Sequence, residues 1–415
     1  MFVRLSNTPR DYPWGSRTEI SDLLGTQPSG GPEAELWLGA HPGSPARILD
    51  PHTVGGAANV REWITADPET ALGAHTQLPF LLKVLAADGP LSLQAHPTLE
   101  RAIEGFAREN AAGIPLDAPN RNYKDPLHKP EVIYALSDRF EALCGFRPLA
   151  EIRAIFAVLQ AWDAASAVTA PALFTPVSER LEAGGTDNVL RSLVEWLLSG
   201  GEEVAALVNH VVDLVASRDA TAIAFEAAAA VFAPSFETVR DLAASYPGDP
   251  GIVTSLLLNR VSLKAGEALY LPAGNIHAYL SGLGIELMAA SDNVLRGGLS
   301  PKYIDVPELL SVLTFESLPV PYIWPRYPSK GVEEFRPDVS DFVLLRIKTD
   351  INERASYRAA GAAIALCVSG SLELHGEASS QTINRGEALF ITPDEGAITL
   401  TGEGIVFIAA PGSPA

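Results

Sequence analysis

Two stretches of the chain share one layout: residues 263–282 read LKAGEALYLPAGNIHAYLSG, and residues 383–402 read INRGEALFITPDEGAITLTG. Each places GEAL and an aromatic residue ahead of a proline turn, after which a further short apolar run begins. Short apolar runs bounded by Gly and Pro are typical of β-strands. We therefore expect two related all-β domains. The first copy alone has a histidine after its turn, His277, so we expect chemistry in that domain only.

The chain divides into four segments by its hydrophobic pattern. Residues 1–146 and 249–318 hold short apolar runs separated by Gly and Pro, whereas residues 147–248 carry apolar residues at three- and four-residue spacing, which is typical of helices. A Pro-rich connector leads to residues 319–415, where strand signals return. The predicted fold class is mainly β with a helical insertion. The first β-domain consists of two parts, the helical domain is inserted between them, and the C-terminal β-domain has no metal ligands.

Charge and hydropathy exclude several classes of partner. The chain has 30 Lys and Arg against 50 Asp and Glu, a formal net charge of −20. Because nucleic acid and anionic membranes attract basic surfaces, we expect neither as a partner. No apolar run reaches the roughly 20 residues of a membrane-spanning helix, and the first residues lack the apolar core of a secretion signal. With two distant cysteines, Cys144 and Cys367, expected to be reduced, the sequence predicts a soluble cytoplasmic protein.

The first copy carries a recognisable turn motif. Gly266, Pro272, Gly274 and His277 have the spacing of the second conserved motif of the cupin barrels, which this stretch resembles. Pro272 ends a strand, Gly274 permits a tight turn, and His277 then points inward from the returning strand. Ser281 replaces the Asn that usually closes the motif. Since a cupin barrel commonly holds a divalent metal, we expect His277 to be one of several ligands.

Three further residues are candidate ligands beside His277. Gln94 and His96 lie two residues apart, so on an extended chain both side chains leave the same face. Glu131 opens an apolar strand, where a carboxylate is costly to bury without a cation. Two imidazoles, one carboxylate and one amide oxygen would bind zinc and leave room for water or substrate. Spacing alone leaves open that Gln94 and His96 only satisfy backbone groups.

Six segments extend the resemblance over most of the chain: YPWGS, AELWLGAHP, LPFLLKVLAADGPLSLQAHP, YKDPLHKPEVIYAL, LPAGNIHAYL and SDNVLRGGLSPKYID. In this order they resemble the type I mannose-6-phosphate isomerases, and the trailing domain agrees in layout. The resemblance implies a catalytic cupin domain, a helical domain and a second cupin-like (jelly-roll) β-barrel domain. The departures are mild, because Leu93 stands where Ile is common and Gly297 and Gly298 form a pair.

The resemblance also implies roles for individual residues. It implies one zinc ion per chain, held by Gln94, His96, Glu131 and His277. It implies an essential arginine, which is Arg296 in the SDNVLRGGL stretch. It implies a sugar phosphate as substrate, with contacts from Ser92, Lys83, Lys302 and Glu286.

The implied reaction interconverts mannose 6-phosphate and fructose 6-phosphate by moving a proton between C2 and C1 through an enediol. Zinc with a single carboxylate ligand keeps a net positive charge and can act as a Lewis acid toward the sugar's oxygens. Arg296 can share the charge that develops on the substrate. Lys83 and Lys302 can supply the local cations that a chain of net charge −20 needs in order to bind a phosphate.

Several points stay open on the sequence alone. Lys129 and Asp292 are both candidate bases for proton transfer, and His128 is a candidate for assisting ring opening, whereas we expect Glu131 to be occupied by zinc. Arg296 could instead pair with Asp292. Two other classes of protein remain: an iron dioxygenase, whose facial triad also uses two His and one carboxylate, and a sugar-binding cupin without catalysis. We expect a monomer.

Overall fold

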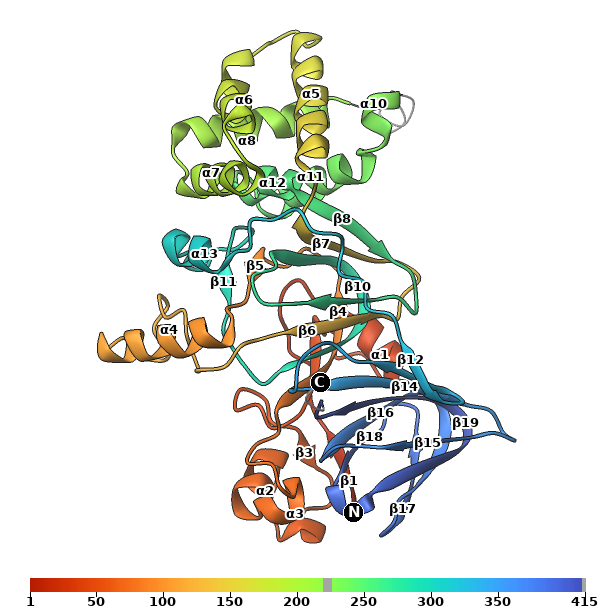
Figure 1. Cartoon of the computed structure of the whole chain (residues 1–415). Coiled ribbons are helices and arrows are strands. Elements are labelled where there is room, and N and C mark those ends of the chain that lie inside the picture. The colour runs from red at the N-terminus through yellow and green to blue at the C-terminus, as the bar shows by residue number, and fades with distance from the viewer. Residues whose placement is uncertain (219–225, 413–415) are drawn as a thin grey trace.

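The computed structural model describes residues 1–218 and 226–412. These residues form two antiparallel sheets and a helical region, with the helices gathered at one end of the molecule and the C-terminal strands at the other (Figure 1). The fold is therefore mixed α/β with extensive antiparallel sheets and a helical content of 31%. No closed barrel is found among the described strands, so the two cupin-like barrels stay a prediction.

The first sheet has nine strands: β2 (Glu35–Leu38), β4 (Phe80–Ala87), β5 (Gln94–Ala95), β6 (Glu131–Ala135), β7 (Phe140–Phe146), β8 (Leu258–Leu263), β9 (Ala268–Leu271), β10 (His277–Ala289) and β11 (Leu295–Arg296). Strand β10 joins the two parts of this sheet, because it pairs with different strands along its length. Residues 277–281 of β10 pair with β5 and β7, whereas residues 282–289 pair with β4 and β6. The register shifts between Tyr279 and Ser281, where the strand changes partners.

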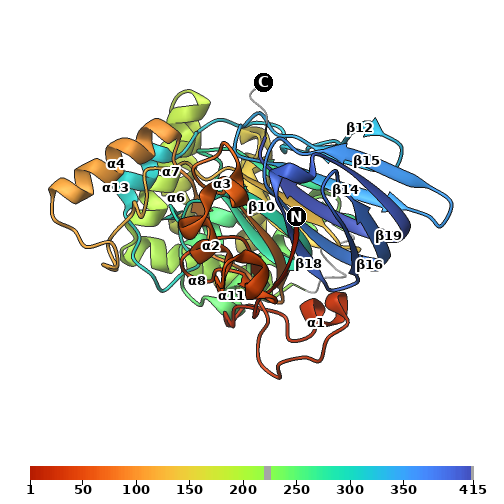
Figure 2. The ribbon, with the colours of Figure 1, turned by 90° about the horizontal axis from the view of Figure 1, so that it is seen from below.

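The second sheet has ten strands: β1 (Phe2–Ser6), β3 (Arg47–Ile48), β12 (Arg326–Ser329), β13 (Val332–Phe335), β14 (Val343–Thr349), β15 (Arg354–Arg358), β16 (Ala363–His375), β17 (Ser380–Asn384), β18 (Ala388–Ile391) and β19 (Ala397–Ala410). Strand β1 pairs with β18, with Val3 opposite Phe390, and Figure 2 shows the N-terminus beside this strand. The predicted division placed residues 1–146 in the first β-domain, but their first strand lies in the sheet of the C-terminal strands.

The repeated layout of the sequence corresponds to a repeated strand–turn–strand in the structure. Strands β9 and β10 form the first copy, and β18 and β19 form the second. Gly282 has a φ of 121°, and a Cβ added there would lie 2.8 Å from Phe140 Cα. Gly402 has a φ of 100°, and a Cβ added there would lie 2.6 Å from Ser371 O. Glycine is therefore required at the same point of both long strands.

The helical region packs on one face of the nine-stranded sheet. Its elements are α5 (Leu149–Ala164), η2 (Pro171–Phe174), α6 (Thr175–Glu182), α7 (Thr186–Ser199), α8 (Glu202–Ala216), α10 (Ala227–Ala230), α11 (Ala233–Ser245), α12 (Gly251–Thr254) and η3 (Ser255–Leu257). The residues around β5 and β10 that join its apolar core are Leu93, Ala95, Ile276, Ala278 and Leu280. Because side chains alternate along a strand, Gln94 and His277 face the other way. The helices thus cover the back of the surface that carries the candidate ligands.

The remaining helices lie near the sheets: α1 (Glu19–Leu24), η1 (Pro51–Val54), α2 (Val60–Ala66), α3 (Pro68–Leu72), α4 (Leu99–Ala111), α13 (Val306–Val312) and η4 (Pro393–Glu395). None of the helices in the described residues has both the length and the hydropathy that crossing a bilayer requires. Cys144 and Cys367 are both free and buried, as predicted.

Candidate metal centre

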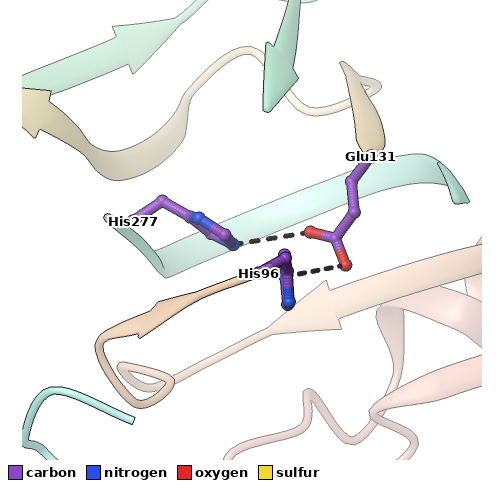
Figure 3. Close-up of side chains that lie close together, drawn as sticks. All are labelled: His96, Glu131 and His277. Carbon is purple, nitrogen blue, oxygen red and sulfur yellow. Dashed lines mark ion pairs between the residues drawn. The ribbon is translucent and has the colours of Figure 1, made fainter. Parts of the chain in front are cut away.

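Three side chains from separate parts of the nine-stranded sheet point toward one another (Figure 3). His96 follows β5, Glu131 begins β6 and His277 begins β10. His96 Nε2 lies 3.4 Å from Glu131 Oε1, and His277 Nε2 lies 3.4 Å from Glu131 Oε2. Their candidate ligand atoms all lie within 4.8 Å of one another, and all three residues are buried. Such a group can hold a metal ion.

The bend of β10 brings these residues together. Glu131 lies opposite Met288, near the end of β10, yet its carboxylate meets His277 at the beginning of the same strand. A straight strand would hold residues 277 and 288 more than about 30 Å apart. Because β10 changes partners after Tyr279, its two ends face each other across the interior of the sheet.

Both imidazoles have their Nδ1 atoms bonded to backbone carbonyls. His96 Nδ1 lies 2.8 Å from Asn293 O, and His277 Nδ1 lies 3.1 Å from Asn275 O. A carbonyl oxygen only accepts, so each Nδ1 donates and each Nε2 of a neutral ring carries a lone pair. Burial, followed by the charge of Lys129, lowers the pKa of His96 to about 4. The His96 ring is therefore neutral at pH 7, which is the form that binds metals.

The centre is a set of buried acceptors without donors between them. His96 Nε2, His277 Nε2 and Glu131 Oε2 have no hydrogen-bond partner among the described residues. A buried polar atom without a partner is costly, and here the ring lone pairs face a carboxylate. One bound cation would satisfy all three atoms at once. Two imidazoles oriented through Nδ1 and one carboxylate are a donor set that fits zinc.

Lys129 is the catalytic candidate that contacts this centre directly. Its Nζ lies 2.8 Å from Glu131 Oε1, and both residues are buried. Burial alone would raise the pKa of Glu131, but the neighbouring positive charge of Lys129 holds this pKa well below its ordinary value. Glu131 is therefore a carboxylate at neutral pH, as a metal ligand must be.

Gln94 and Arg296 extend the centre along one row of the sheet. Gln94 on β5 lies opposite His277 on β10 and opposite Arg296 on β11. Residues directly opposite in a sheet present their side chains on the same face. Gln94 thus lies between His277 and Arg296, two residues that the sequence predicted for the site.

A cavity of about 550 Å³ begins at Arg296. Its lining residues are Tyr12, Pro13, Trp14, Gly89, Pro90, Ser92, Ser245, Tyr246, Arg296, Leu299, Ser300, Pro301 and Lys302. This lining has two cations and no carboxylate, in a chain of net charge −20. Burial, and then the charge of Arg296, lowers the pKa of Lys302. Two cations that face each other without a counter-ion favour an anionic ligand.

Lys83 and Glu286 lie apart from that cavity. They are opposite each other on β4 and β10, both are buried, and Lys83 Nζ lies 2.8 Å from Glu286 Oε2 and 3.6 Å from Glu35 Oε1. Burial alone would lower the pKa of Lys83, but the charges of Glu286 and Glu35 raise this pKa above its ordinary value. The cation of Lys83 is therefore already neutralised by two carboxylates and is not among the residues that line the cavity.

Asp292 and His128 each have a partner elsewhere. Asp292 Oδ2 lies 2.9 Å from His41 Nε2, and both residues line another cavity of about 320 Å³. His128 Nε2 lies 2.9 Å from Asp341 Oδ2, in the segment between β13 and β14. The pairing of Arg296 with Asp292 that the sequence left open is not observed in the described residues, since Asp292 pairs with His41.

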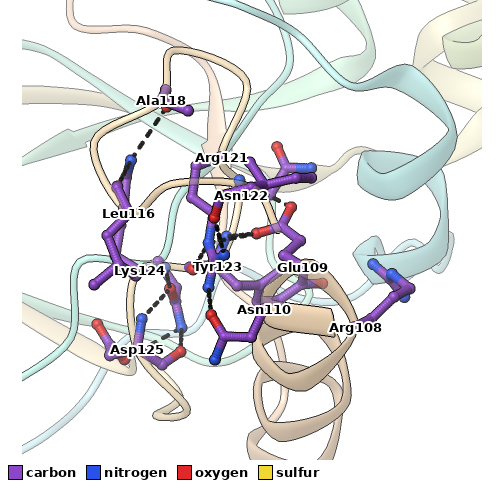
Figure 4. Close-up of polar contacts among 12 residues, drawn as sticks. Arg108, Glu109, Asn110, Leu116, Ala118, Arg121, Asn122, Tyr123, Lys124 and Asp125 are labelled. Carbon is purple, nitrogen blue, oxygen red and sulfur yellow. Dashed lines mark hydrogen bonds and ion pairs between the residues drawn. The ribbon is translucent and has the colours of Figure 1, made fainter. Parts of the chain in front are cut away.

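A polar loop holds Asn293, whose backbone carbonyl orients His96. Figure 4 shows the contacts within this loop, from Arg108 to Asp125. The buried Asn293 side chain accepts from Lys124 N at 2.7 Å and donates to Asp125 O at 2.8 Å. The same loop is tied to α4 by Arg121, whose Nε lies 2.9 Å from Glu109 Oε2. Sequence reasoning missed Asn293, although it stands in the SDNVLRGGL stretch from which Arg296 and Asp292 were selected. Asn293 orients His96 through its backbone carbonyl. Every residue has such a carbonyl, so the residue type gives no sign of this role.

The fold and the centre together define a protein built on antiparallel sheets, with a triad able to hold a metal ion and a cavity lined by two cations and no carboxylate. A family model described as "Phosphomannose isomerase type I, catalytic domain" matches residues 2–149. Mannose-6-phosphate isomerase of Escherichia coli (strain K12) is 39% identical over 409 residues, which cover 97% of this chain and 97% of that protein. The human protein of the same name is 32% identical, covering 94% of this chain and 93% of the relative.

Solved structures agree with these relatives. A crystal structure of mannose 6-phosphate isomerase bound with zinc and yttrium has a TM-score of 0.82 and 34% sequence identity. The likeness covers 99% of this chain and 100% of that one. The chain belongs to the mannose-6-phosphate isomerase family.

Proposed function

We propose that this chain is a zinc-dependent aldose–ketose isomerase that interconverts D-mannose 6-phosphate and D-fructose 6-phosphate by enediol proton transfer. The observation that carries the proposal is the buried triad in which His96 Nε2, His277 Nε2 and Glu131 Oε2 have no hydrogen-bond partner among the described residues. A cavity lined by two cations and no carboxylate accompanies it. The names of the relatives and the zinc-bound structure of a family member support it.

The proposed zinc ligands are His96, Glu131 and His277, with Gln94 as the fourth. A bound zinc ion supplies a Lewis acid for the oxygens of the open-chain sugar. Gln94 lies opposite His277 and contributes a neutral oxygen, so the site keeps a net positive charge. The buried residues around it exclude bulk water, which strengthens electrostatic interactions with the substrate.

The phosphate end of the substrate is proposed to bind in the cavity beside Arg296. Ser92 can donate a hydroxyl there, and Lys302 can supply a charge. Arg296 stands between this cavity and Gln94, so it can also stabilise the negative charge that develops as a proton leaves the sugar carbon. Lys83 and Glu286 stay predicted substrate contacts, although their side chains pair with each other at 2.8 Å and do not line this cavity.

Lys129 is the proposed proton-transfer residue. Its Nζ contacts the carboxylate of the metal centre, whereas Asp292 pairs with His41 and His128 pairs with Asp341. Asp292 and His128 stay predicted participants in proton transfer and ring opening. The two cupin-like barrels, the domain limits, the cytoplasmic location and the monomeric state also stay predictions; the two repeated strand–turn–strand units support the pair of related β-domains.

The test is an isomerase assay of the zinc-loaded protein against a panel of sugar phosphates, with metal content measured on the same sample. Mannose 6-phosphate should turn over, activity should disappear on chelation, and zinc should restore it. A second class, the iron dioxygenase, shares the two-His, one-carboxylate donor set. Activity that requires oxygen and iron would show an iron dioxygenase and contradict the isomerase proposal. Tight sugar binding without turnover would favour a sugar-binding cupin without catalysis.

A further inference from the structure

A cavity of about 460 Å³ lies between the two sheets, and none of the proposed metal ligands is among its lining residues. One wall comes from β6 and the turn between β8 and β9, and the other comes from the second sheet and the connector before it. Its lining residues are Tyr134, Ala135, Leu136, Ala265, Gly266, Trp324, Pro325, Tyr327, Glu333, Arg346, Val368, Ile405 and Phe407. A cavity with aromatic walls and a few polar groups is typical of small-molecule sites.

Tyr134 forms the floor of this cavity. The residue is 4% exposed, and its ring packs edge-on against Phe335 at 5.3 Å and Phe407 at 5.0 Å. Its hydroxyl makes no hydrogen bond to another described residue and is not among the fully buried unpaired atoms, so a ligand in the cavity can reach it. Burial raises the pKa of Tyr134, so the hydroxyl keeps its proton and can donate to a ligand in the cavity.

Two aromatic rings stand at the mouth. Trp324 is 69% exposed and Tyr327 is 71% exposed. The backbone just before them is paired with β9, because Tyr270 N donates to Pro321 O at 2.9 Å and Ile323 N donates to Ala268 O at 3.0 Å. Large aromatic surfaces held in water at the rim of a cavity offer a flat apolar face to a ligand.

The polar wall is a matched pair of charges. Arg346 NH1 lies 3.0 Å from Glu333 Oε2, and both side chains are partly exposed. The guanidinium has further donors and the carboxylate has further lone pairs for a ligand. This pair is neutral as a whole, in contrast to Arg296 and Lys302, the two cations that line the cavity beside the metal centre together with no carboxylate. The cavity therefore favours an uncharged ligand with several hydroxyl groups.

We propose that this cavity between the sheets is a second carbohydrate site, which binds a neutral pyranose. The apolar C–H face of the ring packs against Trp324 and Tyr327. Its hydroxyl groups bond with Tyr134, Glu333 and Arg346. A phosphorylated sugar gains nothing there, because the site has no excess positive charge.

The test measures the binding of methyl α-D-mannopyranoside and methyl β-D-glucopyranoside to the full chain, by saturation-transfer NMR and by calorimetry. Dissociation constants on the order of millimolar are expected, as for small polar ligands. Trp324→Ala should weaken binding by about tenfold or more, and Tyr134→Phe, which removes only the hydroxyl, by about threefold to tenfold. The control is Ile351→Ala, a truncation at a residue that is 75% exposed in the β14–β15 turn, and it should bind as the unmodified chain does.

Mannose 6-phosphate turnover should be unchanged in Trp324→Ala, which separates this site from the metal centre. Binding that survives both Trp324→Ala and Tyr134→Phe overturns the proposal. So does the absence of binding to the unmodified chain, and so does a preference for adenosine over both glycosides, which would mark the cavity as a site for a planar base.

Discussion

At the residue scale, the metal centre is defined by three buried acceptor atoms that have no hydrogen-bond partner among the described residues. Two ring lone pairs and a carboxylate oxygen converge in a buried space with no donor between them. In an ordinary buried cluster a proton would sit between such atoms, but both Nδ1 protons already bond to carbonyls. The cluster is therefore arranged for a cation rather than for an internal hydrogen bond.

Glu131→Gln tests this reading with a change that keeps the shape of the side chain. The amide cannot provide a negative charge, so zinc affinity should fall by about 10-fold to 100-fold or more, and activity should fall with it. The measurement is zinc content after dialysis against a graded chelator. His375→Gln, at an exposed histidine beside Glu373, is the control and should keep its zinc. Full zinc occupancy in Glu131→Gln would remove this carboxylate from the centre.

Arg296→Ala tests the cavity beside the centre. Loss of one preorganised donor at a developing charge typically costs about 10²-fold to 10³-fold in turnover, and we expect kcat for mannose 6-phosphate to fall in that range. Arg47→Ala, at an exposed arginine of β3, is the control for the loss of one positive charge. Steady-state kinetics separate the two effects: a change in KM alone would make Arg296 a phosphate anchor without a role in the chemical step.

Some of these residues could be predicted and others could not. The sequence could predict that Gln94 and His96 point to the same side, because the alternation of side chains along an extended chain depends only on residues next to each other. The surroundings of Lys83 could not be read in the same way, since its partners Glu35 and Glu286 come from strands far away in the sequence. Lys83 pairs with these two carboxylates, and its predicted contact with a phosphate stays a prediction.

At the scale of elements, β10 determines the geometry of the centre. One strand belongs to both halves of the first sheet, and its bend returns Glu131 to His277. The sequence predicted the strand–turn–strand and its repeat, because Gly and Pro punctuate both copies. It did not predict that β1 pairs with β18. Tertiary packing determines which strand pairs with which, and the sequence of one strand does not specify its partner.

Gly282→Ala should destabilise the bend of β10. The position has a φ of 121°, and the new Cβ would lie 2.8 Å from the backbone of Phe140, so strain and crowding add up to roughly 2–4 kcal/mol. Gly184→Ala is the matched control, since it has a φ of 103° and nothing within 4 Å. It should cost only about 1–2 kcal/mol. Urea midpoints compare the two, and equal losses would mean that the close approach to Phe140 contributes nothing.

At the scale of the whole molecule, the helical region and the two sheets share their cores. One apolar cluster runs from the helices into β5, β7 and β10, and another joins β4 and β6 to the second sheet. Polar contacts also link the first sheet to the helical region. Glu141 on β7 pairs with Arg260 on β8, and Arg260 Nε donates to Thr238 of α11 at 2.8 Å. We therefore expect the stability of the whole chain to depend on the charge of Glu141.

Acid should weaken the molecule in part through this carboxyl group. Burial alone would raise the pKa of Glu141, but hydrogen bonds from Arg260, Ser262 and Arg139 lower it below its ordinary value of 4.5. The folded state thus binds this proton less tightly than the unfolded state does. The stabilisation is complete above the ordinary pKa and is lost as the pH falls through the folded value.

Glu141→Gln should therefore be less stable than the unmodified chain at pH 7, and the difference should shrink as the pH falls below about 4. The metal centre titrates in both proteins, so its contribution cancels when urea midpoints of the two are compared at each pH. Glu104→Gln, at an exposed position of α4, is the control and should follow the unmodified chain at every pH. A Glu141→Gln curve that stays parallel to that chain down to acid pH would show that the carboxylate gives no charge-dependent stability. The contact between β7, β8 and α11 would then be held by packing alone.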